Sequence, residues 1–227
     1  VTIQNGLLQE FDFGVQLNAG STGNIVSALT VQLNQEAGIQ LTDADNTMLR
    51  ANHAVSNYQG IVLLDGTQNA QVRDNTVSGN CGNGVYLLNA STNRLEANQI
   101  TASSEAGIAL ENASNNTLIG NTLSANSGGG VVIGADLLPS NNNRVEEHLI
   151  NGNTEGISLV DSSGNQLLGN TVQSNDGGIT LDNAQNNLIR GNDVRFNSGG
   201  IELSDSSGNT IEANNASGAS GSGIAVE

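Results

Sequence analysis

The sequence contains no lysine and no tryptophan, and only one residue each of cysteine, proline and methionine. Aromatic residues are 2% of the 227 residues, so a core built on large rings is excluded. A single cysteine cannot form an internal disulfide or a Cys-x-x-Cys metal site. No apolar run approaches the roughly 20 residues that a membrane-spanning helix needs, which argues against membrane insertion. The core must therefore come from Val, Ile, Leu and Ala.

Positive charge is also scarce, because six arginines face 22 acidic residues and the formal net charge is −16. A nucleic-acid partner needs a basic surface that matches the phosphate backbone, and this chain has none. An anionic membrane surface is excluded on the same ground. The simplest consequence of the charge is a well-solvated acidic surface.

Asparagine and glycine are abundant, with 35 and 29 residues, and both are poor helix formers. A degenerate word, Gly-(Ile/Val)-x-(Leu/Ile/Val), recurs ten times at intervals of 22–26 residues. Its glycines are Gly14, Gly38, Gly60, Gly84, Gly107, Gly130, Gly156, Gly178, Gly200 and Gly223. Such a regular period indicates an array of structural repeats.

Each repeat contains three short segments with alternating apolar residues, separated by Asn, Gly, Asp and Ser, as residues 165–181 show most clearly. Alternation with a period of two predicts strands, and the interruptions predict turns. Because three strands of a few residues cannot bury an apolar face alone, successive repeats must stack. A leucine-rich repeat has a similar period, but its L-x-x-L-x-L-x-x-N core is missing. The sequence predicts an all-β, single-stranded parallel β-helix (solenoid) of about ten rungs with three parallel sheets.

The unit N-x-(I/L)-x-(G/A)-N-x-(V/I)-x-x-N-x-x-G-(I/V)-x-L resembles the repeat of right-handed parallel β-helix proteins of the pectate-lyase-like superfamily. It is most similar to the carbohydrate-binding and sugar-hydrolase type repeats that also occur in NosD-like periplasmic proteins. The resemblance extends over essentially the whole chain and implies a right-handed helix. The superfamily includes pectate lyases, mannuronan epimerases, polygalacturonases, phage tailspikes and non-catalytic surface proteins.

In a stacked array each repeat position becomes a row of side chains along the axis. The first predicted row is a structural asparagine ladder of Asn52, Asn75, Asn98, Asn121, Asn170, Asn192 and Asn214. Stacked amides of this kind can satisfy neighbouring backbone groups and each other. His148 occupies the Asn position of its own repeat, so we expect it to replace an asparagine there.

A further row accepts Asp and Asn interchangeably, which indicates turn chemistry rather than catalysis. Its members are Asp43, Asp65, Asn89, Asn112, Asp161, Asn183 and Asp205. The alternative interpretation of this row is calcium binding, because aligned Asp and Asn oxygens suit a hard cation. Asp43 and Asp65 are the predicted calcium ligands, although no cofactor is required by the fold.

The outward position within the repeated word includes a small apolar strip, Val62, Tyr86 and Ala109, which is the candidate glycan-binding surface. A second outward row predicts exposed ion pairs between Arg73 and Glu96 and between Arg190 and Glu212. No residue is assigned a catalytic role, because no carboxyl pair or nucleophile with its base stands out.

Enzymes that resemble this fold build clefts from long turn insertions, whereas the single noticeable insertion here is residues 134–143. We therefore expect a non-catalytic module of an extracellular, cell-surface or periplasmic protein, which serves as a spacer, an adhesion domain or a glycan contact. The alternative is part of a polysaccharide lyase, C5-epimerase or glycoside hydrolase. Residues 1–227 are expected to form one domain of a longer protein, monomeric, with end-to-end contacts at uncapped rungs.

Overall fold

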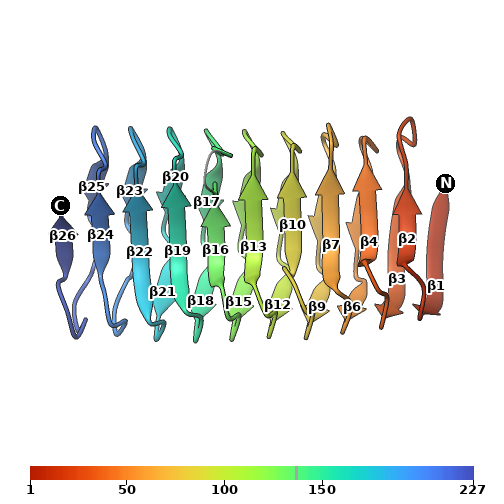
Figure 1. Cartoon of the computed structure of the whole chain (residues 1–227), viewed down its shortest axis with the longest axis horizontal. Coiled ribbons are helices and arrows are strands. Elements are labelled where there is room, and N and C mark those ends of the chain that lie inside the picture. The colour runs from red at the N-terminus through yellow and green to blue at the C-terminus, as the bar shows by residue number, and fades with distance from the viewer. Residues whose placement is uncertain (136–137) are drawn as a thin grey trace.

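The computed structural model describes residues 1–135 and 138–227 and shows only strands and turns in these ranges. Parallel strands wind around one long axis, and successive rungs lie side by side along it (Figure 1). The result is an all-β parallel solenoid of about ten rungs, which confirms the predicted fold class. None of the described residues belongs to a helix long and apolar enough to cross a bilayer.

One sheet contains ten strands, which cover the face of the molecule seen in Figure 1. It consists of β2 (Phe13–Leu17), β4 (Ala37–Thr42), β7 (Gln59–Leu64), β10 (Val85–Leu88), β13 (Ala106–Glu111), β16 (Gly129–Ile133), β19 (Glu155–Val160), β22 (Gly177–Asp182), β24 (Ile201–Ser204) and β26 (Ile224–Val226). Each of these strands contains the apolar part of the repeated word, and the glycine lies in the strand or directly before it, so the word marks one position of every rung.

The other strands form two further ladders. The first contains β5 (Met48–Arg50), β8 (Gln71–Arg73), β11 (Arg94–Glu96), β14 (Thr117–Ile119), β17 (Arg144–Glu146), β20 (Gln166–Leu168), β23 (Leu188–Arg190) and β25 (Thr210–Glu212). The second contains β6 (His53–Val55), β9 (Thr76–Ser78), β12 (Gln99–Thr101), β15 (Thr122–Ser124), β18 (Leu149–Asn151) and β21 (Thr171–Gln173).

The two short-strand ladders meet near the N-terminus. There β1 (Thr2–Gln9) and β3 (Ile25–Gln32) are continuous strands of eight residues, and β3 pairs with both β5 and β6. Hydrogen bonding therefore joins these ladders into one sheet of 16 strands. The three predicted ladders are present, but they belong to two hydrogen-bonded sheets, because the bend between the ladders is absent from the first rungs.

The core is a stack of identical aliphatic positions. Ile39, Ile61 and Val85 lie in register on consecutive strands of the ten-stranded sheet, and each is fully buried. Burial of one such side chain contributes about 1.5–3 kcal/mol, but only while the next rung covers it. Packing therefore couples every rung to its neighbours.

The glycine of the repeated word is required by close approach between rungs. A Cβ atom on Gly107 would lie 2.8 Å from the carbonyl oxygen of Gly130 and 2.7 Å from a methyl group of Leu123. On Gly84 it would lie 2.7 Å from the carbonyl oxygen of Gly107. A larger residue at these positions would push the rungs apart, which explains the glycine at the start of the word in the stacked repeats from Gly14 to Gly200.

Buried asparagines join the rungs at the tight turn between the two short-strand ladders. The Asn121 Oδ1 atom accepts hydrogen bonds from the backbone N–H and the Nδ2 group of Asn98, both at 2.9 Å. The Asn121 Nδ2 group donates to the carbonyl oxygen of Leu95 at 3.1 Å. One amide thus satisfies three groups of the preceding rung, none of which has access to water.

His148 stands in this row with the hydrogen-bonding role of an asparagine. Its ring Nδ1 atom accepts a hydrogen bond from the backbone N–H of Asn121 at 3.1 Å. The backbone N–H of His148 donates to Asn170 Oδ1 at 3.0 Å. The ring proton is therefore on Nε2, which is buried without an acceptor. Burial lowers the pKa of His148 to about 3.

We predict that Asn121→Ala destabilises the protein by about 1–3 kcal/mol, because three buried groups lose their partner. Gln99→Ala is the control, since Gln99 is exposed on the adjacent strand, and it should change stability by less than about 0.5 kcal/mol. Urea denaturation of both variants measures the difference. Equal midpoints for the two variants would contradict the role of the amide.

A second prediction concerns the pH dependence of stability. His148 stays neutral in the folded state down to about pH 3, whereas an unfolded histidine binds a proton near pH 6.5. Stability of the wild type therefore decreases as pH falls below about 6.5, by up to about 1.4 kcal/mol per unit. In His148→Asn this contribution is absent, so its free energy of unfolding should rise relative to wild type between pH 6.5 and 4. A constant difference across that range would show that His148 is protonated in the fold.

Candidate functional site on the outward face of the ten-stranded sheet

One row of side chains runs along the outward face of the ten-stranded sheet. Strand register aligns Gln16, Gln40, Val62, Tyr86, Ala109, Val132, Ser158, Thr180, Glu202 and Ala225. The row is mainly polar toward both ends, apart from the terminal Ala225, and mainly apolar in its middle. An extended polymer that lies along the axis would meet one of these side chains at each rung, about 4.8 Å apart.

The candidate binding residues Val62, Tyr86 and Ala109 are neighbours in this row. Val62 is 4% exposed and Ala109 is 5% exposed, whereas Tyr86 is partly exposed. The ring of Tyr86, rather than an open apolar strip, is therefore the aromatic surface available to a ligand.

Tyr86 is held in place by its hydroxyl group, which donates a 2.7 Å hydrogen bond to Glu111 Oε2 on the next strand. Partial burial and this hydrogen bond raise the pKa of the Tyr86 phenol well above its ordinary value. The ring is thus an ordered, neutral platform at any physiological pH.

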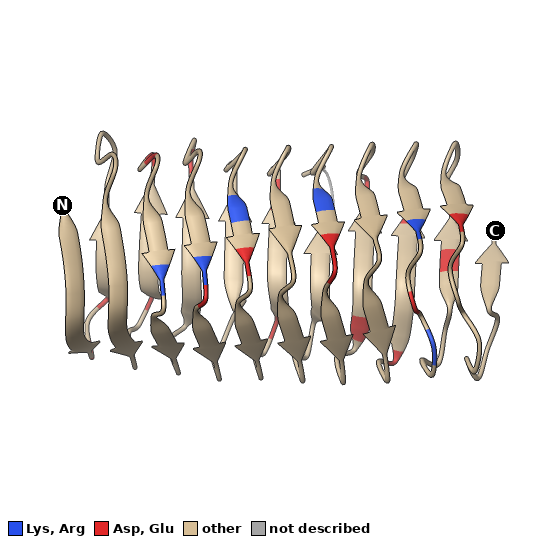
Figure 2. Ribbon diagram, turned by 180° about the vertical axis from the view of Figure 1, so that it is seen from behind, with Lys and Arg blue, Asp and Glu red and all other residues tan. Residues whose placement is uncertain are grey.

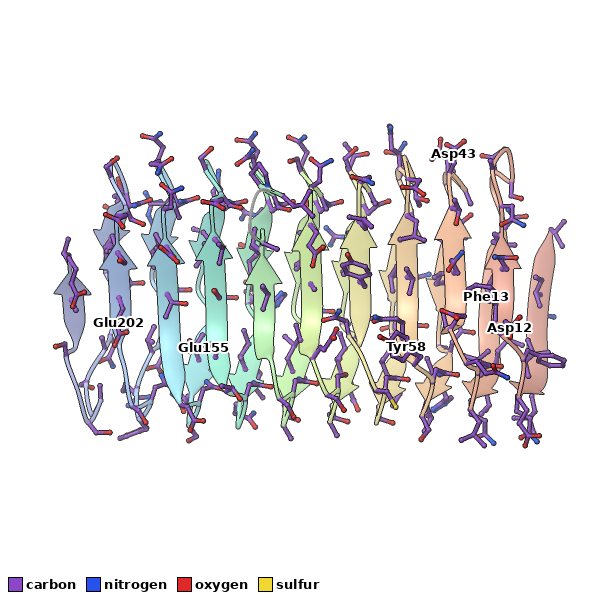
Figure 3. The ribbon with its side chains drawn as sticks, in the orientation of Figure 1. Asp12, Phe13, Asp43, Tyr58, Glu155 and Glu202 are labelled. Atoms are coloured by element: carbon purple, nitrogen blue, oxygen red, sulfur yellow. The ribbon has the colours of Figure 1, made fainter. Side chains whose placement is uncertain are left out.

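Acidic residues gather along the edge of the sheet where its strands begin. We call this edge the acidic margin; it contains Asp12, Glu36, Glu105, Glu155 and Asp176, and Glu202 lies beside it in the outward row. Figure 3 shows Asp12, Glu155 and Glu202 along this edge, with Asp43 at the opposite edge. The margin gives this side of the face a negative potential.

Amide side chains extend the margin by hydrogen bonds between rungs. The backbone N–H of Asn83 donates to Gln59 Oε1 at 2.7 Å, and Asn83 Nδ2 donates to Glu105 Oε2 at 2.7 Å. Asn83 Oδ1 in turn accepts the backbone N–H of Ala106 at 3.0 Å. The Glu105 carboxylate is thereby oriented by the fold.

Glu155 is the most perturbed carboxyl of the margin. Burial raises its pKa, and the charges of Glu202 and Asp176 raise it further. Its Oε2 atom is buried without a hydrogen-bond partner and occupies the space where a Cβ atom of Gly177 would lie. The glycine therefore makes room for a carboxyl that is held in an unfavourable environment.

The acidic margin was not identified from the sequence, although a signal was present. Asp12, Glu36, Glu105 and Asp176 each stand two residues before the glycine of the repeated word. Glycine, tyrosine, threonine or serine occupies that position in other repeats, so the row is incomplete in sequence. Only the stacking of rungs brings the acids into one line.

The predicted calcium ligands lie at the opposite edge, at the turns that follow β4 and β7. Asp43 and Asp65 are exposed and have positive φ angles of 48° and 44°, which confirms the turn role of their row. Asp65 Oδ1 accepts a 3.1 Å hydrogen bond from Asn89. Within residues 1–135 and 138–227 no group of three or more His, Cys, Asp or Glu side chains could enclose a metal. Calcium binding at Asp43 and Asp65 stays a prediction.

Of the two predicted ion pairs, one forms as expected. Arg190 donates to Glu212 on the adjacent rung. Glu96 lies in register with Arg73, but its carboxylate pairs with Arg94 on its own strand, at 2.9 Å. The expected Arg73–Glu96 contact is wrong, because a partner two residues away on one face of a strand reaches the carboxylate first. The insertion at residues 134–143 lies partly outside the described residues.

Comparison with protein families agrees with this geometry. The family described as periplasmic copper-binding protein (NosD) matches residues 2–136, and the family described as right handed beta helix region matches residues 93–227. Each match includes more than half of the chain. The chain belongs to these right-handed β-helix families. Its solenoid is therefore right-handed and pectate-lyase-like, as the repeat resemblance implied. No curated protein sequence matches the chain.

Solved structures with the same fold include proteins that act on polysaccharide. The Dettilon tailspike protein superposes with a TM-score of 0.71 at 16% identity, over 100% of this chain and 59% of its own. The periplasmic alginate epimerase AlgG gives 0.70 at 13% identity, over 92% of this chain and 61% of its own. The A-module of Azotobacter vinelandii mannuronan C-5 epimerase AlgE4 gives a TM-score of 0.63 at 14% identity, over 97% of this chain and 78% of its own. At these identities the likeness shows the fold alone, and the chain spans about three fifths of the first two structures.

The residues of this β-helix protein do not fit the copper ion in the name of the NosD family. Copper sites use imidazole, thiolate and thioether ligands. Cys81 is exposed in the turn between β9 and β10, His53 is exposed on β6, and the His148 ring is buried in the Asn row. The single thioether, Met48 Sδ, contacts the Arg73 guanidinium at 3.8 Å, beside which a cation is disfavoured.

We predict that Tyr86 ionises only well above the ordinary tyrosine pKa of about 10. Tyr58→Phe leaves Tyr86 as the single tyrosine, so its ultraviolet absorption during alkaline titration reports this group alone. Addition of Glu111→Gln should lower the midpoint, because a charged acceptor is lost. A midpoint near pH 10 in both variants would show that the phenol is free of Glu111.

Proposed function

We propose that this chain is a non-catalytic β-helix module of a secreted, surface or periplasmic protein, and that it contacts neutral glycan along the outward face of the ten-stranded sheet. The observation that carries the proposal is the continuous row of outward side chains in register, with the anchored ring of Tyr86 at its centre. A linear polymer can contact such a row at many rungs without a cleft.

The chemistry of the row suits sugar rings. Gln40, Ser158 and Thr180 offer hydrogen-bond donors and acceptors for hydroxyl groups. The Tyr86 ring presents a flat apolar face, and its polar end is already satisfied by Glu111. Because the strands beneath are fixed by rung-to-rung hydrogen bonds, little conformational entropy is lost when a ligand binds.

Electrostatics favours a neutral polymer over an acidic one. Glu105 and Glu155 flank the row, Glu202 belongs to it, and the chain carries a net charge of −16. None of the ten strands of this sheet contains an arginine that could offset them. An acidic glycan therefore needs a bridging cation, for which we propose calcium at Asp43 and Asp65, completed by the carboxylates of the polymer itself.

The comparisons support a glycan contact in a general way. Alginate is the polymer in the name of AlgG, and AlgG and the NosD family are both described as periplasmic. These names motivate the choice of polysaccharide as the partner class and of a periplasmic or extracellular site of action for this chain.

A polysaccharide-active enzyme is the second candidate, and Glu155 is the observation that favours it. A carboxyl with a raised pKa beside Asp176 and Glu202 has the character of a general acid next to carboxylates. The non-catalytic function is preferred because Glu155 stands at the edge of a sheet whose ten strands contain no basic residue. Polysaccharide turnover by the wild-type chain that is lost in Glu155→Gln would establish the enzymatic function.

Calorimetric titration with neutral cello-, manno- and xylo-oligosaccharides tests the proposal. We expect one of them to bind, and Tyr86→Ala to weaken that binding by about tenfold, or about 1.4 kcal/mol. Tyr58→Ala is the matched control, because Tyr58 is exposed outside the row and its removal should change little. Equal affinity in both variants, or no binding by any neutral oligosaccharide, would reject the proposed surface.

Pectate and alginate form the acidic arm of the same experiment. We expect tight binding only with calcium, and its loss in EDTA and in Asp43→Asn/Asp65→Asn. Tight pectate or alginate binding that survives EDTA would contradict the electrostatic argument.

A further inference from the structure

Four of the six arginines are neutralised by carboxylates at short distance. Arg94 lies 2.9 Å from Glu96, Arg144 lies 2.7 Å from Glu146 and Arg195 lies 2.6 Å from Asp193. Arg190 is in direct contact with Glu212. In a chain with 22 acidic residues such pairing is the natural outcome. The two remaining arginines, Arg50 and Arg73, therefore call for an explanation.

Arg50 and Arg73 are neighbours in register on β5 and β8. Their strands lie about 4.8 Å apart, and like charges directly opposite each other on one face destabilise a sheet. Figure 2 shows the two basic positions on adjacent strands toward the N-terminal end of the molecule. The sheet thus places two positive charges on adjacent strands, with no rung between them.

Neither guanidinium group is satisfied. Among the described residues, the Arg50 guanidinium group has no hydrogen bond and no ion pair. Arg73 Nη1 is 3.9 Å from Asp74 Oδ2, beyond hydrogen-bonding distance, and its Nη2 faces the weak acceptor Met48 Sδ at 3.8 Å. Its Nε atom is buried without any acceptor, which is costly for a charged donor.

The two arginines line a hollow of about 350 Å³. Ser27 and Gln4 continue the same row on the two preceding rungs and also line it. Ser27 is 5% exposed, and its hydroxyl group forms no hydrogen bond to a described residue. The hollow is therefore lined by two guanidinium groups, one hydroxyl and the two amides of Gln4 and Asn5, with Asp74 as the single carboxylate at its rim.

We propose that this hollow binds an oxyanion: a carboxylate, sulfate or phosphate group. The oxygens of such a group accept hydrogen bonds from both planar guanidinium forks, and its charge removes the repulsion between them. Ser27 and Gln4 supply further donors. Asp74 opposes the anion, and the site is open to solvent, so a dissociation constant in the millimolar range is expected, about 1 mM.

This site is separate from the proposed glycan contact. It lies on the 16-stranded sheet, whereas the outward row belongs to the ten-stranded sheet. Loss of anion binding would leave the Tyr86 surface unaffected, and failure of the glycan experiment would leave the anion site unaffected.

The experiment uses the full chain and three probes, namely inorganic phosphate, sulfate and galacturonate, at constant ionic strength set with sodium chloride. Arginine Nε–Hε signals in nitrogen–proton NMR spectra are followed during each titration. We expect a saturable shift of the Arg73 signal, and at least tenfold weaker binding in Arg50→Gln and in Arg73→Gln. The probe that binds most tightly identifies the source of the oxyanion.

Two further variants sharpen the test. Arg144→Gln removes an arginine that is already paired with Glu146 and should leave binding within twofold of wild type. Asp74→Asn removes the opposing carboxylate and should tighten binding several-fold. All variants are checked for an unchanged melting profile. Absence of a saturable shift with all three probes, or equal affinity in Arg50→Gln and wild type, would overturn the proposal.

Discussion

Hydrogen bonds between successive rungs are the interaction on which this molecule depends. A single rung contains strands of three to eight residues, and its polar backbone is satisfied by the rung before and the rung after it. The Asn121 amide shows the principle, because it serves Asn98 and Leu95 rather than residues near it in sequence. Aliphatic stacking reinforces the same contacts, so neither acts alone.

This dependence explains why some positions accept only one or two residue types whereas others accept many. Gly107 must lack a side chain because the next rung approaches to contact distance, and the Asn row accepts His148 only because Nδ1 can take the place of an amide oxygen. Outward positions are free of these demands. Glutamine, tyrosine, serine, threonine and charged residues occur there, and any function of the chain has to be carried by such outward side chains.

The same stacking sets the electrostatics of the surface. Residues 22–27 positions apart become neighbours, so the environment of a charged side chain depends on its row rather than on its neighbours in sequence. Arg94 finds Glu96 within its own strand, and Arg190 finds Glu212 one rung away. Arg50 and Arg73 lie opposite each other on adjacent strands, with Asp74 3.9 Å from Arg73, and Asp176 and Glu202 lie near Glu155. Stacking thus produces a pair of like-charged arginines on one sheet and, at the edge of the other sheet, a partly buried carboxyl whose pKa is raised.

The sequence by itself determined the solenoid, its rung length, the inward Ile and Leu positions, and the turn role of Asp43 and Asp65, because each follows from a period that can be counted. It also identified the outward row with Tyr86. The tertiary structure decided which outward groups are free: Val62 and Ala109 are covered, Tyr86 is tied to Glu111, and Glu96 prefers Arg94 to Arg73. The physical reason is that periodicity specifies which positions stack, whereas burial and ion pairing depend on side-chain reach across rungs, which no repeat pattern contains.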